Sequence, residues 1–154
     1  MRIKGFTLIE VLLSVFIITV AVLGLYNGIS YAFNSIEKAK DQFIAAYLAE
    51  EGVEIVKNLR DSNFVASKNW KEGLESCATG CRADYESTSL EINTPDKKLL
   101  INDQGYYNYT EGNETPFSRK ITITEKDTDK IMVEAEVFYG DHKFLLRRYL
   151  YNWK

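Results

Sequence analysis

The feature that most constrains this chain is a long run of uncharged, mostly apolar residues near its N-terminus. From Val11 to Ile36, 26 residues in all, no side chain carries a charge. As an α-helix such a run would rise about 39 Å, at about 1.5 Å per residue, which exceeds the ~30 Å hydrocarbon core of a bilayer. The run therefore predicts a single membrane-spanning helix.

One carboxylate, Glu10, stands at the start of this run and opposes its insertion into a membrane. Between Phe6 and Leu25 there are 14 Phe, Leu, Ile or Val residues, which favour insertion by roughly 4–8 kcal/mol in total. An acidic residue costs about 2.5–3.5 kcal/mol at the bilayer centre and less near its edge, so insertion still prevails. Glu10 is then either a functional carboxylate that pairs with a cation, or a charge that reaches the membrane interface.

The residues around Glu10 resemble a known processing signal. The segment Gly5-Phe6-Thr7-Leu8-Ile9-Glu10-Val11-Leu12 is similar to the signal of type IV prepilins and of the pseudopilins of type II secretion systems. The resemblance implies that a prepilin peptidase removes a leader, residues 1–5, by cutting after Gly5. It also implies that the new terminus, Phe6, is N-methylated and that Glu10 pairs with the terminal amine of a neighbouring subunit.

The leader predicts how the chain sits in the membrane. Its two basic residues, Arg2 and Lys4, favour a cytoplasmic N-terminus and an exported remainder. It is too short for a secretory signal peptide, and no small-residue cleavage site follows the apolar run, so we expect the helix to be retained. Loss of the leader changes the net charge from −3 to −5, so no nucleic acid partner is expected.

Two glycines, Gly24 and Gly28, lie in the apolar helix with the spacing of a small-xxx-small pair. Such a pair permits close packing against neighbouring helices, or marks a place where the helix can unwind during assembly. The alternative is a helix that leaves the lipid and merely tolerates two glycines. Both readings remain open from the sequence.

Beyond Ile36 the pattern stays helical but becomes amphipathic. Apolar residues recur at i, i+4 on one side, while charged residues occupy much of the rest, which predicts a face that packs on a globular head. We expect one helix over residues 6–60, about 80 Å long, with residues 6–30 as its membrane-spanning and assembly half. A membrane anchor leading into a coiled-coil stalk is the alternative. The residues on the predicted packing face are Phe43, Ile44, Tyr47, Leu48, Val53, Ile55, Val56 and Leu59.

The globular head is predicted over residues 61–154 and begins with an irregular loop, residues 61–87, which contains both cysteines. Cys77 and Cys81 are four positions apart across a Gly-containing turn. In an exported domain this spacing favours a disulfide, which would stiffen a local hairpin, over two free thiols. A metal site is disfavoured because there is no second Cys pair and only one histidine.

The rest of the head, residues 88–154, alternates as β-strands do. Ile131, Val133, Ala135, Val137 and Tyr139 share one side of a predicted strand, which is typical of a half-buried antiparallel sheet. Further strands are expected at residues 89–92, 98–101, 106–109, 119–124 and 144–151. The predicted fold class is α+β, with the long N-terminal helix packed on a small antiparallel β-meander.

Other chemistry is scarce in the sequence. There is no phosphate-binding loop, nucleophile elbow or metal-ligand cluster, so we expect no catalytic residue, no metal site and no cofactor. His142 is interpreted as a solvated turn residue rather than a catalytic group. Glu111-Gly112-Asn113-Glu114-Thr115 fits a bacterial N-glycosylation acceptor at Asn113, and Asn108-Tyr109-Thr110 fits the shorter sequon.

The resemblance therefore implies a non-enzymatic filament subunit close to a minor pilin. A type II secretion pseudopilin, or a plain single-pass anchored binding protein, are the alternatives. The implied partners are other pilin or pseudopilin subunits, a prepilin peptidase and methyltransferase, a membrane assembly platform, and membrane lipid before assembly. The implied location is the inner membrane, with a cytoplasmic N-terminus, followed by an extracellular or periplasmic filament.

Overall fold

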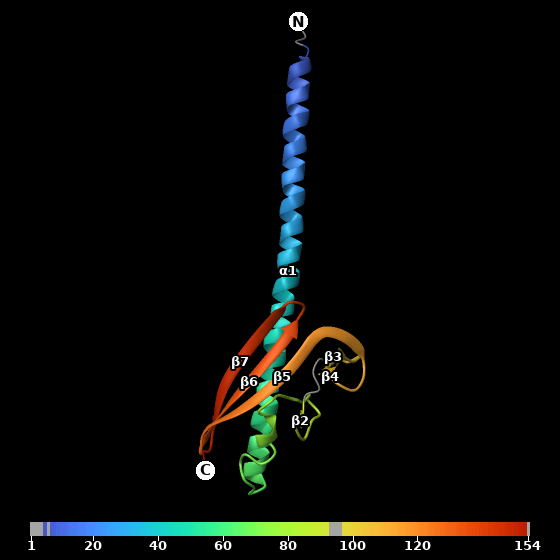
Figure 1. Ribbon diagram of the computed structural model, residues 1–154. Coiled ribbons are helices and arrows are strands. Elements are labelled where there is room, and N and C mark those ends of the chain that lie inside the picture. Colours follow the sequence, from blue (N-terminus) through green and yellow to red (C-terminus); the bar gives the residue numbers. More distant parts are fainter. Residues whose placement is uncertain (1–4, 6, 93–96, 154) are drawn as a thin grey trace. The chain divides into compact units, whose positions relative to one another are not determined.

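The computed structural model describes Gly5, residues 7–92 and residues 97–153 (Figure 1). The chain divides into two compact units, Met1–Lys40 and Asp41–Lys154.

The helix α1 comprises Leu8–Val65. It begins two residues after the expected start at Phe6 and ends five residues beyond the expected end at Arg60. In the first unit its apolar side chains are exposed, and the helix is long and apolar enough to cross a membrane. The hydroxyls of Ser14 and Thr19 donate to the carbonyls of Glu10 and Val15 at 2.7 and 2.8 Å, so these two polar groups are satisfied within the helix itself.

In the second unit one face of α1 belongs to the hydrophobic core. Alanines and Gly52 along this face allow the sheet to approach closely, because they carry little or no side chain. The expectation was wrong for Phe43 and Tyr47, which are 77% and 68% exposed on the opposite side of the helix. The buried positions are Ala45, Leu48, Ala49, Gly52, Val53, Ile55, Val56, Arg60 and Phe64.

The sheet is antiparallel and is organised around its longest strand, β5 (Asn113–Asp127). One edge of β5 pairs with β6 (Lys130–Tyr139), which in turn pairs with β7 (His142–Tyr151). The other edge of β5 pairs with β3 (Lys98–Ile101) and with β1 (Cys81–Arg82). The short strands β4 (Tyr107–Asn108) and β2 (Glu91–Ile92) extend the sheet beyond β3 and β1. The predicted α+β class is confirmed.

Alternation along the strands decides which side chains enter the core. In β6, Ile131, Val133, Ala135 and Val137 are buried while the intervening residues are partly exposed, as the period of two requires. The same alternation in β5 buries Thr115, Phe117, Arg119, Ile121 and Ile123. A charged residue therefore occupies the middle of the apolar face of β5.

The segment predicted as an irregular loop contains two short elements. A 3₁₀ turn, η1 (Glu75–Cys77), precedes β1, and a disulfide joins Cys77 to Cys81 with a Cα–Cα distance of 5.2 Å. Both cysteines are fully buried in the core. The bridge thus fastens η1 to the start of β1 inside the core, whereas we had expected it to stiffen a hairpin.

Candidate processing and assembly site

Thr7 fixes the N-terminus of α1. Its carbonyl accepts from the backbone N–H groups of Glu10 and Val11 at 3.1 and 3.3 Å, and its Oγ1 accepts from the N–H of Glu10 at 3.4 Å. Thr7 is therefore the N-cap and Glu10 the third helical residue, which is the Thr-x-x-Glu arrangement of a capping box. Residues 7–10 thus set the start of the helix and also place the Glu10 carboxylate about one turn from the predicted cleavage site after Gly5.

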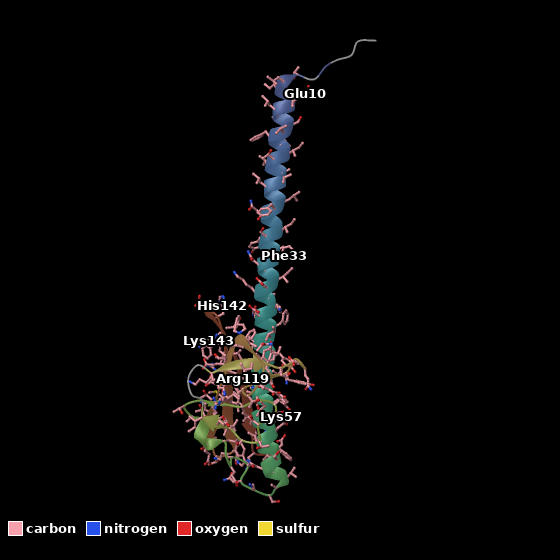
Figure 2. The ribbon with its side chains drawn as sticks, turned by 90° about the vertical axis from the view of Figure 1, so that its right-hand side faces the viewer. Glu10, Phe33, Lys57, Arg119, His142 and Lys143 are labelled. Carbon is pink, nitrogen blue, oxygen red and sulfur yellow. A yellow bond between two sulfur atoms is a disulfide. The ribbon has the colours of Figure 1, made fainter. Side chains whose placement is uncertain are left out.

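Glu10 is exposed and lies in the first turn of α1 (Figure 2). A carboxylate there interacts favourably with the positive end of the helix dipole, by about 0.3–1 kcal/mol at an exposed site. No ion pair to Glu10 occurs among the residues that the structure describes. Its charge is therefore not neutralised by any residue that the structure describes.

Gly5, the residue predicted to precede the cleavage, is exposed and lies outside the helix, and a Cβ at this position would meet no atom within 4 Å. Phe6, the predicted methylation site, and the rest of the leader, residues 1–4, lie outside the described residues. The predicted cleavage and methylation therefore stay predictions.

Gly24 and Gly28 are surrounded by open space, since a Cβ built on either would meet nothing within 4 Å. No contact within the described chain thus requires a glycine at these two positions. Their predicted role in packing against neighbouring helices stays a prediction.

The second unit contains a buried charged cluster that sequence reasoning missed. The side chain of Arg119 on β5 is fully buried and lies against α1 (Figure 2). Its Nη1 donates to the carbonyl of Leu48 at 2.7 Å and to Oε2 of Glu51 at 2.8 Å, and its Nη2 donates to the carbonyl of Ala83. One guanidinium therefore joins α1, β5 and the segment after β1, because its rigid fork presents several donors at once.

Gly52 provides the space for this cluster. A Cβ at Gly52 would lie 3.0 Å from Cδ and 3.5 Å from Nε of Arg119. The sequence carries one signal that would have found Arg119: it has the same strand parity as Ile121 and Ile123, both of which are buried.

The two sequons differ in their surroundings. Asn108 is only 2% exposed, and its Oδ1 accepts from the backbone N–H groups of Thr110 and Glu111, both at 2.8 Å. Asn113 is exposed at the start of β5, but Thr115, two residues on, is buried and its hydroxyl donates to the carbonyl of Leu99 at 2.6 Å. Glycosylation at Asn113 stays a prediction, and in the folded chain its threonine hydroxyl is already engaged.

The remaining candidate groups are dispersed. His142 is exposed at the turn between β6 and β7, with its ring 5.8 Å from that of Tyr139 (Figure 2). Burial raises the pKa of Tyr109 above its ordinary value, and the nearby Arg119 guanidinium partly opposes this shift. Among the residues that the structure describes, no group of three or more His, Cys, Asp or Glu side chains could hold a metal ion.

Comparison with known proteins assigns the N-terminal segment. Residues 1–26 match the family model of the prokaryotic N-terminal methylation motif, which is the signal of type IV pilins and pseudopilins. No curated protein and no solved structure matches the chain. The motif and the apolar helix behind it are those of pilin-like, membrane-anchored structural proteins.

Proposed function

We propose that this chain, which carries the N-terminal signal of type IV pilins and pseudopilins, is a structural subunit of a type IV pilus or a related filament, close to a minor pilin. In this proposal a prepilin peptidase removes residues 1–5, Phe6 is N-methylated, and the apolar half of α1 enters a bundle of helices. The match of residues 1–26 to the methylation motif is the observation that carries the proposal.

The exposed apolar surface of α1 supplies the cohesion of such a bundle. From Leu8 to Ile36 its large side chains are half or more exposed, and neighbouring helices or lipid would cover them. Between helices in lipid, cohesion comes from close packing, to which Gly24 and Gly28 contribute by letting backbones approach. Before assembly the same surface holds the subunit in the inner membrane with its N-terminus in the cytoplasm.

Glu10 sets the register of the bundle in this proposal. Its carboxylate has no cation among the described residues, and an unpaired charge in a dry apolar core is strongly penalised. The terminal ammonium of a neighbouring subunit, created when the leader is cut, is likewise penalised if it is left without a partner of opposite charge. Pairing the two favours one axial position of the incoming helix over the others.

The first test is mass spectrometry of the mature N-terminus, from native membranes and from sheared surface filaments. The expected species begins at methylated Phe6. A chain that still carries Met1–Gly5 in cells with an active prepilin peptidase would contradict the proposal, and a plain membrane-anchored binding protein would then be the better account.

Two substitutions separate the charge of Glu10 from its role in starting the helix. Glu10→Gln keeps a capping-box residue but removes the charge, and Glu10→Ala removes both. We expect both variants to insert in the membrane while their incorporation into filaments falls about tenfold or more, because one buried charge is left unpaired. Glu37→Ala, outside the uncharged run, is the matched control. Undiminished incorporation of Glu10→Gln would refute the pairing role.

A further inference from the structure

The outer face of α1 in the second unit carries an exposed patch of aromatic and acidic residues. Phe43, Tyr47, Glu50 and Glu54 recur at steps of four, three and four along the helix, so they share one face. Phe43 and Tyr47 are 77% and 68% exposed. Glu50 has no ion pair among the described residues, whereas Glu54 pairs with Lys57 at 2.9 Å. We call these four residues the helix patch.

A second, different patch lies at the end of the β6–β7 pair that is opposite its connecting turn. Lys130 is opposite Tyr151 in the strand register, and its Nζ lies 4.1 Å from the ring centre of Tyr149 and 5.5 Å from that of Tyr151. The two tyrosines are 49% and 51% exposed. We call Lys130, Tyr149 and Tyr151 the strand patch.

Lys130 differs from two other cations of this hairpin, Lys143 and Arg147, while Arg148 resembles it in having no carboxylate partner among the described residues. Lys143 pairs with Glu136 at 3.0 Å, and Arg147 pairs with Glu134. Within the described ranges, Lys130 has cation–π contacts and no carboxylate partner. The strand patch thus offers an unneutralised positive charge between two exposed aromatic rings.

The two patches are complementary in charge and alike in their aromatic content. The negative charge of Glu50, next to Tyr47, is opposite in sign to the positive charge of Lys130, next to Tyr149. Exposed aromatic residues are also typical of the centres of protein interfaces. Because the patches are different surfaces of one chain, a contact between them is heterologous. Heterologous contacts that do not close into a ring produce open helical filaments.

We propose that the helix patch of one copy binds the strand patch of a second copy of this chain. The choice of a second copy as the partner rests on the proposed filament function. The contact itself lies wholly within residues 41–154 and is additional to the packing of the apolar helices.

Photo-crosslinking of the full chain in its native membrane tests the contact. A benzoylphenylalanine introduced in place of Tyr47 should give a product of twice the chain's mass, with its crosslink at Lys130 or within residues 149–153. Glu50→Lys and Lys130→Glu should each lower the yield about threefold or more, because an attraction becomes a repulsion. The double exchange Glu50→Lys with Lys130→Glu should restore it. Glu75→Lys, an exposed carboxylate on η1, is the control with the same charge change and should have no effect.

The outcomes separate this contact from the filament function. A crosslink to the strand patch in cells whose chains keep the leader would support the contact and contradict the filament proposal. Filaments of chains that begin at Phe6, without this crosslink, would support the filament and overturn the contact. A crosslink to a different protein, or a double exchange that fails to restore the yield, would also overturn it.

Discussion

Replacing Arg119 with methionine should lower the free energy of unfolding of the second unit by about 3–5 kcal/mol, the range found when one partner of a buried ion pair is removed. The change leaves the carbonyls of Leu48 and Ala83 without the guanidinium. A buried acceptor that loses its donor costs about 1–3 kcal/mol. The side chain of Glu51 is 20% exposed, so water can hydrate it and its share of the loss is smaller.

Two further variants divide this loss. Arg119→Lys keeps the charge but loses the fork, so we expect it to recover at most about half of the stability, since an ammonium lacks the planar geometry. Glu51→Gln removes only the partner charge and should cost about 1–2 kcal/mol. The pair Arg119→Met with Glu51→Gln should be no less stable than Arg119→Met alone, because the two residues are coupled.

Urea unfolding of the full chain in detergent, followed by the fluorescence of buried Trp70, measures these free energies. Trp153→Phe, which removes an exposed second indole, serves as the background for all variants. A loss below about 1 kcal/mol for Arg119→Met would refute the reasoning, since the cluster would then contribute no more than an exposed ion pair.

Two further predictions concern the loop after β4. Gly112 has a φ of +119°, and a Cβ there would lie 2.2 Å from the carbonyl oxygen of Ile101. Gly112→Ala should therefore lower the free energy of unfolding in urea by about 3 kcal/mol. The control is Gly105→Ala, before β4, where φ is +85° but a Cβ would meet open space; it should cost about 1–2 kcal/mol. An equal cost at both glycines would show that the close approach to Ile101 is unimportant. Burial raises the pKa of Tyr109, so the folded state keeps this phenol neutral after the unfolded chain has begun to ionise; its contribution to stability is complete below about pH 10 and is lost as the pH rises through the folded pKa. Tyr109→Phe should cost about 1 kcal/mol at neutral pH, because the hydrogen bond to the Arg119 carbonyl is lost. Above about pH 10 the stability of this variant should fall less steeply with pH than that of the unsubstituted chain. Parallel pH profiles of stability would contradict this assignment.

The sequence was most informative where one physical signal acted alone. The alternation of β6 correctly predicted the burial of Ile131 and Val133, because the period of two leaves no other face for them. The helix face was harder to predict, since Phe43 and Tyr47 are apolar and recur at i, i+4 just as residues of the buried side do, although they lie on the opposite side of the helix. Apolar character alone could not decide between a core and an exposed patch.

Arg119 was missed for a different reason. A basic residue in a strand is usually exposed, and nothing local to β5 indicates that Glu51 and Gly52 lie opposite it. The pairing of β1 and β3 with β5 was equally hidden, since β1 is only two residues long and β3 only four. Such short strands form only by pairing with a longer strand, so their own residues show too little alternation to predict them.

The position of β5 at the centre of the sheet implies an order of folding opposite to the order of synthesis. The β5–β6–β7 meander closes through two tight turns, at residues 128–129 and 140–141, so its contacts are local and form early. The segments that contain β1 and β3 leave the ribosome first, yet their neighbour in the sheet is β5. Until β5 has been made, the β1–β2 and β3–β4 pairs lack the strand that joins them into one sheet, and the cysteines can oxidise before the core that will enclose them is present. The last third of the chain thus serves as the template on which the middle third acquires its structure.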